Sequence, residues 1–258
     1  MDGPPFRVER LPEERIAKIV FCRPQKLNII TVPERRQLRD TFEVLERDPE
    51  VRVLILEGEG GRAFSSGGDI VDFLKHTPYE MSEFADLIAA PERFPRPVIA
   101  AVDGYAMGVG LELALCCDFI LATRRSVFAF PEIRLGAIPG SGGTQRILRL
   151  MGTIRAKDFL MRGRRMAAEE AERVGLITRM VEPEALAQEV LALARELVAG
   201  PPVAQTVLKR LLNKGGDCSL SAALELEGRA FGLLISTRDW QEGVQAWREK
   251  RAPRFEGR

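Results

Sequence analysis

Short apolar runs predict β-strands in the first half of the chain. Residues 15–22 (RIAKIVFC) alternate between apolar and polar side chains, which is typical of a half-buried strand. Residues 51–58 (VRVLILEG) and 96–104 (RPVIAAVDG) are rich in valine, isoleucine and leucine and end in glycine, so they predict buried strands. Residues 126–136 (SVFAFPEIRLG) predict a strand followed by a turn.

Helical periodicity alternates with these strands and then dominates the rest of the chain. Helices are predicted between Pro33 and Pro49, over 142–152, over 167–177 with Gly175 as a left-handed cap, and from Glu184 onward with a break at 200–202. The repeated order of strand, strand and helix predicts an α/β core over residues 1–195. Residues 196–258 are then expected to form a C-terminal helical region that serves oligomerisation.

The most apolar stretch of the chain is DGYAMGVGLELALCCDFILA, residues 103–122. Together with the predicted strand before it, the run from Val98 to Ala122 could be mistaken for a membrane span, but Asp103, Glu112 and Asp118 lie inside it. Charged side chains at the centre of a bilayer cost several kcal/mol. We therefore expect a turn, a buried helix and a strand here.

Composition narrows the class of protein without identifying it. The chain has 258 residues, 45% of them hydrophobic and 29% charged, which is typical of a globular protein. Its formal net charge is +1, so bulk charge predicts neither a nucleic acid nor a membrane as partner. The first 18 residues carry acidic side chains and no apolar core, so neither a signal nor a transit peptide is expected.

The four cysteines and the single histidine exclude several chemistries. None of Cys22, Cys116, Cys117 and Cys218 lies in a CxxC pair, so we expect no metal site and a reducing, cytoplasmic compartment. His76 lies in a polar stretch without a GxSxG motif, so it is expected at the surface rather than in a catalytic triad. No phosphate-binding loop or complete dinucleotide fingerprint is present.

Two glycine-rich turns each follow a predicted strand and open a helix. They are FSSGGDI, residues 64–70, and GYAMGVGLE, residues 104–112. Backbone N–H groups at a helix start have no partner within the helix, and glycine lets a ligand oxygen approach them. Two converging turns would form an oxyanion hole, in which each donor contributes about 3 kcal/mol to catalysis. Alternatively, the glycines only make tight turns.

Two glutamates lie among apolar neighbours near these turns. Glu112 falls in the first turn of the helix after Gly108 and Gly110, and Glu132 follows Pro131 at the end of a strand. A buried carboxylate is costly unless it has a partner or a function, and two in one dry pocket can serve as acid and base. The alternatives are that Glu112 caps its own helix and that Glu132 is solvated.

Four longer motifs of the sequence resemble those of a known protein family. AFSSGGDI, AAVDGYAMGVGLELALCCDF, FAFPEIRLGAIPGSGGTQRI and GRRMAAEEAERVGLI occur in the order and spacing of the enoyl-CoA hydratase/isomerase (crotonase) superfamily, which the chain resembles from about Ile16 to Val181. The resemblance implies a right-handed spiral of ββα units with a C-terminal helical region. It also implies a homotrimer or a dimer of trimers, an acyl-coenzyme A substrate and no metal or redox cofactor.

The resemblance also implies roles for particular residues. Glu112 and Glu132 match the two glutamates of hydratases, and the N–H groups of Gly68 and Val109 match the oxyanion hole. Arg23, Lys26 and Leu27 match the segment that lies near the adenine of coenzyme A. The rest of the implied substrate site consists of Ser66, Asp69, Ile70, Gly108, Pro139 and Gly140. Lys209 is either a phosphate contact or a solvated surface residue, and a solvated surface position is also the alternative for Lys26.

Retention of both glutamates favours syn addition of water to a 2-enoyl-CoA through an enolate, as in β-oxidation of fatty acids. Related acyl-CoA reactions remain open: double-bond isomerisation, hydration of a cyclic dienoyl-CoA and thioester hydrolysis. A non-catalytic member that binds coenzyme A or RNA is the alternative from another class, although the sequence has no basic stripe.

Three positions depart from the family pattern. Val109 stands where many relatives have glycine, so its branched side chain is expected to crowd the oxyanion hole and to affect the range of acyl groups. Gly68 replaces a common alanine, which leaves its N–H donor intact. Ala167 stands where relatives often have serine or aspartate, so the following helix lacks a side-chain cap, at a cost of about 1 kcal/mol.

Overall fold

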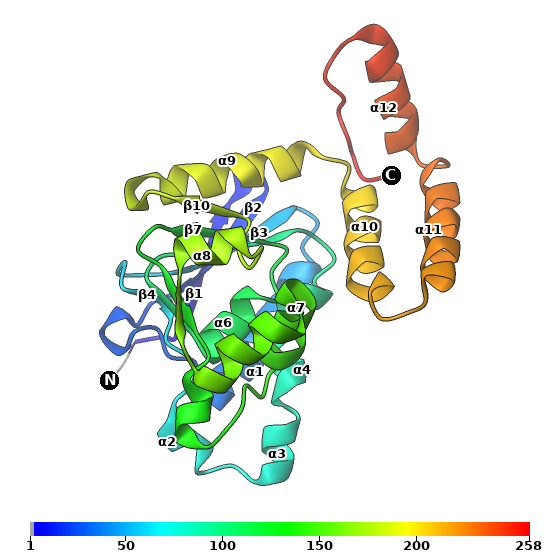
Figure 1. Cartoon of the computed structure of the whole chain (residues 1–258). Helices are drawn as coiled ribbons and strands as arrows, with labels where there is room; N and C mark the ends of the chain where they lie inside the picture. Colours follow the sequence, from blue (N-terminus) through cyan, green and yellow to red (C-terminus); the bar gives the residue numbers. More distant parts are fainter. Residues whose placement is uncertain (1–2) are drawn as a thin grey trace.

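The computed structural model describes residues 3–258 and contains two β-sheets surrounded by helices (Figure 1). The larger sheet has the strand order β1-β2-β3-β5-β7-β10, in which only the β1–β2 pair is antiparallel. Its strands are β1 (Phe6–Leu11), β2 (Ile16–Phe21), β3 (Val53–Gly58), β5 (Val98–Val102), β7 (Phe119–Thr123) and β10 (Arg179–Val181). The smaller sheet contains β4 (Ala63–Ser65), β6 (Tyr105–Met107), β8 (Val127–Ala129) and β9 (Arg165–Ala167), in that order.

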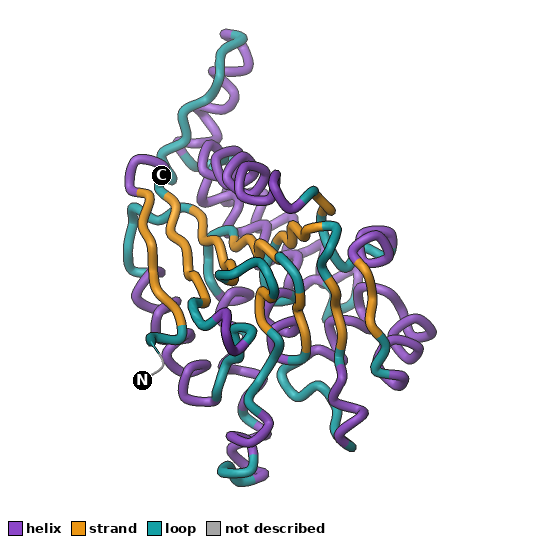
Figure 2. Tube along the Cα trace, turned by 90° about the vertical axis from the view of Figure 1, so that its left-hand side faces the viewer, coloured by secondary structure: helices purple, strands orange, loops and turns teal. Residues whose placement is uncertain are grey.

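The chain passes from the larger to the smaller sheet three times, from β3 to β4, from β5 to β6 and from β7 to β8 (Figure 2). Helical segments follow each passage, which produces repeated ββα units. Two of the corners require glycine. A Cβ on Gly58 would lie 2.4 Å from Ala63 O. Gly104 has φ +79°, and a Cβ there would lie 2.1 Å from Arg62 O.

Helices connect the repeats and complete the C-terminal half. They are α1 (Val32–Glu46), α2 (Ile70–Phe73), α3 (Pro78–Ser82), α4 (Phe84–Ile88), α5 (Ala90–Arg93), α6 (Val109–Ala114), α7 (Gly143–Arg162), α8 (Ala168–Arg173), α9 (Leu186–Ala199), α10 (Pro202–Gly215), α11 (Leu220–Leu234) and α12 (Arg238–Glu249). Short 3₁₀ helices are η1 (Pro12–Glu14), η2 (Pro24–Lys26), η3 (Pro131–Leu135) and η4 (Pro183–Ala185).

Both faces of the inner strands β2, β3, β5 and β7 are largely buried, which explains their continuous apolar runs. Leu54 and Leu56 of β3 belong to the main core, whereas the intervening Ile55 packs in a second cluster on the other face. Val190 and Ala194 of α9 cover this second cluster. Helix α9 therefore belongs to the sheet and spans the predicted boundary between residues 195 and 196.

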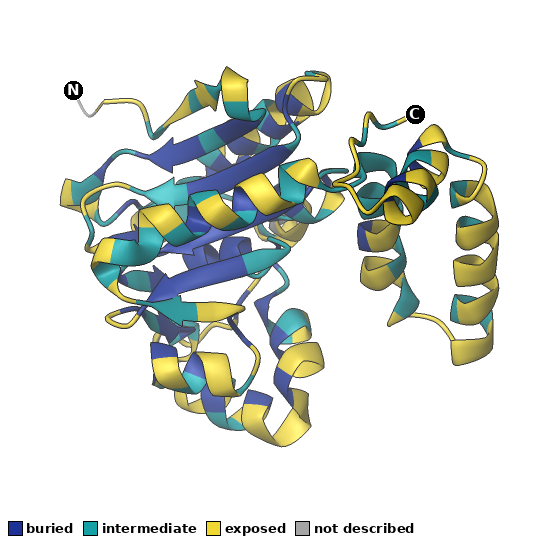
Figure 3. Ribbon diagram, turned by 90° about the horizontal axis from the view of Figure 1, so that it is seen from above, coloured by how far each residue is buried: buried dark blue, intermediate teal, exposed yellow. Residues whose placement is uncertain are grey.

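The chain leaves the core at Gly200, and α10, α11 and α12 project to one side of it (Figures 1 and 3). We call residues 200–258 the C-terminal arm. Most residues of α11 and α12 are exposed, including large apolar side chains such as Leu220, Leu233 and Trp247. The arm therefore buries little of its own apolar surface within one chain.

The structure confirms the predicted strands within 15–22, 51–58 and 96–104. Helix α7 is longer than expected, because it resumes after a kink at Gly152 (φ 74°, ψ 166°) and continues to Arg162. The turn predicted after residue 104 contains the short strand β6. Among residues 3–258, no helix combines the length and apolar character needed to span a bilayer.

Candidate active site

The two glycine-rich turns meet at the start of α6. A Cβ on Gly67 (φ +112°) would lie 3.7 Å from the backbone nitrogen of Val109. The Gly67 carbonyl accepts a hydrogen bond from Ile30 N–H at 2.9 Å, which ties this turn to the chain before α1. Val109 is the first residue of α6, so its N–H has no partner within the helix. The structure thus brings the segments of both predicted donors, Gly68 and Val109, together.

Glycines in these turns are required by close contacts. A Cβ on Gly110 would lie 2.4 Å from Ser65 O, so the absence of a side chain lets α6 pack directly on β4. Gly108 has φ +51°, and a Cβ there would lie 2.9 Å from Glu132 Oε1. These glycines make tight turns, as the alternative interpretation held, and they also leave room for a carboxylate beside α6.

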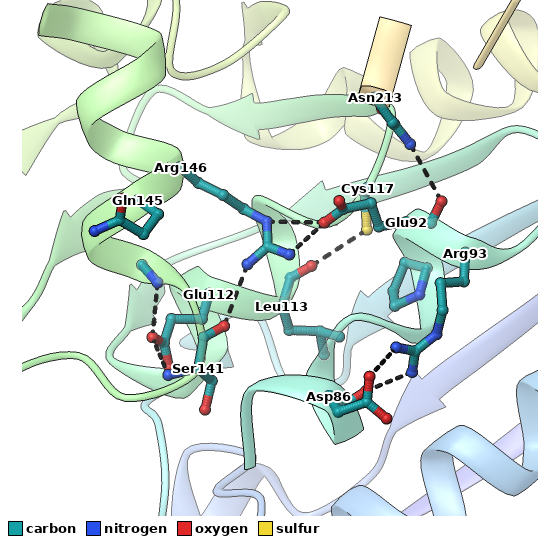
Figure 4. A network of polar contacts seen from close by, with 12 residues as sticks. Asp86, Glu92, Arg93, Glu112, Leu113, Cys117, Ser141, Gln145, Arg146 and Asn213 are labelled. Atoms are coloured by element: carbon teal, nitrogen blue, oxygen red, sulfur yellow. Dashed lines mark hydrogen bonds and ion pairs between the residues drawn. The ribbon is translucent and has the colours of Figure 1, made fainter. Parts of the chain in front are cut away.

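Glu112 is 1% exposed and its carboxylate is held by backbone groups of another helix. Its Oε1 accepts the N–H of Ser141 at 2.7 Å and the N–H of Gly143 at 2.9 Å, at the start of α7 (Figure 4). Burial raises the pKa of Glu112, while these two N–H donors and the positive charge of Arg35 oppose the rise. The carboxylate therefore caps α7 rather than its own helix.

Glu132 lies in η3 and is half-buried beside Gly108. Its Oε2 is buried and accepts no hydrogen bond from the described residues, so one carboxylate oxygen is available to a ligand. Burial raises the pKa of Glu132 to about 7, and the negative charge of Glu112 adds to the rise. Glu132 is not the freely solvated turn residue of the alternative interpretation.

Arg35 also lies at the candidate site, although no sequence motif indicated it. It lies in α1, is 1% exposed, and its guanidinium carbon lies 5.2 Å from the centre of the Phe73 ring. A Cβ on Gly68 would lie 2.9 Å from its Nη2. Burial lowers the pKa of Arg35 to about 10, against the charges of Glu112 and Asp72. Arg35 lies on the buried face of α1, where an apolar residue is expected. A charged residue at such a position in the sequence could have indicated a functional role.

The loop before α1 is tied firmly to the core. Asn28 is buried and its amide nitrogen donates to Ala63 O at 2.8 Å and to Glu59 O at 3.1 Å. The guanidinium of Arg23 is buried and contacts Glu34 Oε2 at 2.5 Å. The predicted adenine-side residue Arg23 therefore stabilises the loop through its side chain, whereas Lys26 is exposed and Leu27 has a left-handed backbone (φ 52°).

The remaining predicted substrate residues surround the same turns. Ser66 donates its N–H to Leu27 O at 2.9 Å, which joins the glycine-rich turn to the loop before α1. Asp69 caps α2 by accepting Val71 N–H at 2.9 Å, and Ile70 is 55% exposed. In the segment between η3 and α7, Pro139 is buried and Gly140 is exposed.

Two side chains have different surroundings from those expected. Lys209 is buried, and its Nζ donates to Asp118 Oδ2 at 2.7 Å, Pro91 O at 2.8 Å and Arg96 O at 3.1 Å. Both interpretations of Lys209 are therefore wrong, because all three of its donor positions serve internal partners. The half-buried His76 lies between the carboxylates of Asp72 and Glu80, at 3.7 and 3.8 Å.

The ββα repeat and the pair of carboxylates beside two N–H-bearing turns define a class of enzyme that stabilises an oxyanion during proton transfer. The family described as Enoyl-CoA hydratase/isomerase matches residues 12–258. The chain therefore belongs to the enoyl-CoA hydratase/isomerase family. Within residues 3–258, no group of three or more His, Cys, Asp or Glu side chains is placed to hold a metal ion.

Similar proteins cover nearly the whole chain. A crotonyl-CoA hydratase of Syntrophomonas wolfei is 37% identical over 94% of this chain and 95% of its own length. A short-chain-enoyl-CoA hydratase of Clostridium acetobutylicum is 35% identical over 93% of each chain. A solved enoyl-CoA hydratase structure from Geobacillus kaustophilus has a TM-score of 0.93, with 37% identity and 99% of each chain covered. The predicted crotonase-like fold is confirmed.

Proposed function

We propose that the protein is an enoyl-CoA hydratase, which adds water across the double bond of a 2-enoyl-CoA thioester. The observation that carries this proposal is the pair of carboxylates: Glu112 is buried, Glu132 lies beside Gly108, and the charge of Glu112 acts on Glu132. Family membership and the names of the similar hydratases support the same reaction.

The surroundings of the two glutamates suggest a division of roles. The Oε1 of Glu112 is fixed by two N–H donors, which favour its carboxylate form as an acceptor of a proton from water. Glu132 has a pKa of about 7 and therefore holds a proton in a good part of the enzyme at neutral pH. We propose that the water oxygen bonds to Cβ as Glu112 takes its proton, while Glu132 delivers a proton to Cα.

Charge would develop on the thioester oxygen as the enolate forms. The N–H groups of Gly68 and Val109 are proposed to donate to this oxygen. The Val109 side chain is only 6% exposed and packs in the main core, so its N–H is presented by a rigid segment. The reaction as proposed needs no metal or redox cofactor.

We also propose where the acyl-coenzyme A substrate binds and how the chains assemble. The nucleotide end of coenzyme A is expected at the loop with Lys26 and the backbone of Leu27, and the acyl part near Ser66, Asp69, Ile70, Pro139 and Gly140. The exposed apolar side chains of the C-terminal arm, such as Leu220 and Trp247, support an oligomerisation role for residues 196–258 in a homotrimer or a dimer of trimers. Four free cysteines fit a reducing cytoplasm, and a role in β-oxidation follows from the reaction type.

The test is incubation with crotonyl-CoA and with a cyclic 2-enoyl-CoA, following the conjugated thioester absorbance and the product mass. We expect a gain of one water, and a loss of about 100- to 10,000-fold in kcat for Glu112→Gln and for Glu132→Gln. Glu50→Gln changes an exposed glutamate whose ion pair is with Arg15, at 3.6 Å; it is the matched control and should leave kcat unchanged.

Other outcomes would identify a different member of the superfamily. A moved double bond with unchanged mass would indicate an isomerase, and release of free coenzyme A would indicate a hydrolase. Coenzyme A binding without any turnover, or a mobility shift with RNA, would contradict the hydratase proposal in favour of a binding function.

A further inference from the structure

The turn that holds Glu112 consists of Ser141, Gly142 and Gly143. Ser141 is 2% exposed, yet the preceding residues from Ile133 to Ile138 are all exposed. Two backbone N–H groups of this turn determine where Glu112 Oε1 lies. Whatever fixes the turn therefore also fixes the catalytic carboxylate.

Arg146, in the first turn of α7, folds back over this segment. Its Nη1 donates to Ser141 O at 3.2 Å (Figure 4). Its backbone N–H donates to Gly142 O at 3.0 Å. Gly142 has φ +96°, and a Cβ there would lie 2.1 Å from Arg146 Nη1. The glycine thus provides the space that the guanidinium occupies, and the arginine closes the turn that the glycine makes possible.

Glu92 of α5 holds the other side of this guanidinium. Its Oε2 accepts Arg146 Nε at 3.0 Å and also accepts Nη2. The backbone carbonyl of Glu92 in turn accepts the side-chain amide of Asn213, from α10, at 3.2 Å. Figure 4 shows the continuous path from Asn213 through Glu92 and Arg146 to Ser141 and Glu112. The first helix of the C-terminal arm is therefore connected to the site by polar contacts.

We infer that Arg146 is a positioning residue for Glu112, held in place by Glu92, and this inference rests on the proposed hydratase function. Arg146 donates a hydrogen bond to the carbonyl oxygen of Ser141. The N–H of Ser141 donates to the carboxylate of Glu112. Without Arg146, the turn loses the contact that fixes its orientation. Misplacing a catalytic group by about 1 Å lowers rates by up to about 100-fold.

The charges around Glu112 come from three elements. Arg35 acts from α1, Glu132 from η3 and Arg146 from α7, and the buried thiol of Cys116 lies on the segment after α6. Replacing Arg146 removes one of two positive charges and loosens two N–H donors. Both changes disfavour the carboxylate form, so the pKa of Glu112 is expected to rise further.

The experiment compares Arg146→Gln, Glu92→Gln and the double variant with the wild type. The control is Arg149→Gln, one turn along the same helix, where the arginine bonds Asp217 of the arm at 2.9 Å and does not touch the turn. With crotonyl-CoA, Arg146→Gln should lower kcat about 10- to 100-fold with KM changed less than about twofold. Glu92→Gln should lower kcat less, and the double variant should be no worse than Arg146→Gln alone.

A readout that does not depend on turnover separates this inference from the proposed function. Carbon-13 NMR of glutamate carboxyl groups, with Glu112→Gln used for assignment, should show a higher pKa for Glu112 in Arg146→Gln than in the wild type and in Arg149→Gln. An unchanged Glu112 titration, or a kcat loss equal to that of Arg149→Gln, would overturn the inference. A wild type without hydratase activity, but with the expected titration shift, would contradict only the proposed reaction.

Discussion

Glu112 and Glu132 differ in what their oxygens touch. Glu112 is almost completely buried and accepts two backbone hydrogen bonds, whereas Glu132 has one buried oxygen without a partner among the described residues. Burial raises the pKa of both, but only Glu132 lacks donors from the other segments that would stabilise its charge. These different surroundings suit the two side chains to the opposite proton-transfer roles that we propose for them.

The first prediction concerns the pH dependence of turnover. Because Glu132 must carry a proton to act as the acid, kcat is expected to fall as pH rises through about 7, the folded-state pKa of this group. The measurement is kcat for crotonyl-CoA between pH 5.5 and 9. A flat profile from pH 6 to 9 would contradict the acid role of Glu132.

The same group should affect stability in a defined direction. A carboxyl whose pKa is raised on folding stabilises the protein below its unfolded-state pKa, and this contribution is lost as pH rises through about 7. Glu132→Gln removes the titration, so its free energy of unfolding relative to the wild type should increase by roughly 1–3 kcal/mol between pH 5 and pH 8. Urea unfolding at both pH values measures this difference, and a decrease would show that the sign is wrong.

Arg35 provides a third prediction. Its positive charge opposes the rise in the pKa of Glu112, so Arg35→Met should shift the acidic limb of the kcat/KM profile to higher pH. Methionine fills similar apolar space, but removing this cation leaves the charges of Glu112 and Asp72 without it and is expected to destabilise the fold, so circular dichroism must show that Arg35→Met is folded. The exposed neighbour Arg36 gives the control Arg36→Met, whose profile should match the wild type. Equal profiles for both variants would contradict the role of Arg35.

Among the elements, the short helix α6 depends most strictly on its neighbours. Its six residues are all buried, and Gly110 lets it approach β4 so closely that no side chain fits between them. The apolar run around it was sufficient to predict a buried helix followed by a strand. The sequence could not predict that β6 precedes it, because a strand of three residues depends on pairing with β4 and β8.

Two glycine substitutions should have opposite effects on stability. Gly110→Ala forces α6 away from Ser65 and is expected to destabilise the fold by about 1–3 kcal/mol and to reduce activity. Gly228→Ala, in α11, meets nothing within 4 Å of the new Cβ and should stabilise the fold by about 0.5–1 kcal/mol. Urea midpoints of both variants provide the comparison, and a neutral Gly110→Ala would contradict the close packing of α6.

The sequence was sufficient to find the residues of the candidate site, but it was not sufficient to find the side chains that surround them. Glu112, Glu132 and the two glycine turns could be found because unusual residues stood in apolar context. The surroundings of Arg35 and Arg146 could not be predicted, since they depend on segments distant in sequence: the charge of Glu112 acts on Arg35, and Glu92 accepts a hydrogen bond from Arg146. The predictions for Lys209 were wrong for the same reason, because its partner Asp118 lies 91 positions away in the sequence.

As a whole, the molecule consists of a well-buried sheet core and an arm that remains largely uncovered. The core clusters include α9 but no residue of α10, α11 or α12, and apolar side chains of the arm such as Leu220, Leu233 and Trp247 are 73–80% exposed. Exposed apolar surface of this kind usually belongs to an interface. A second feature, the Asn213 contact with Glu92, joins this region to the site.

The last prediction concerns the oligomeric state of the protein. Sedimentation of the wild type should give three or six times the chain mass of 28.7 kDa, and Leu220→Glu combined with Leu233→Glu should give smaller species. The control Glu227→Gln changes a polar exposed residue of the same helix and should sediment like the wild type. A monomeric wild type at micromolar concentration would contradict the assembly.

The position of the arm along the chain has a consequence for biosynthesis. Residues 3–199 contain the whole sheet core, and the arm follows after the single connection at Gly200. A growing polypeptide folds from its N-terminus as it is made. The core can therefore become compact while the helices of the C-terminal arm are still inside the ribosome. The exposed apolar side chains of the arm then emerge last, so an assembly of the kind that we propose would form from chains whose cores have already folded.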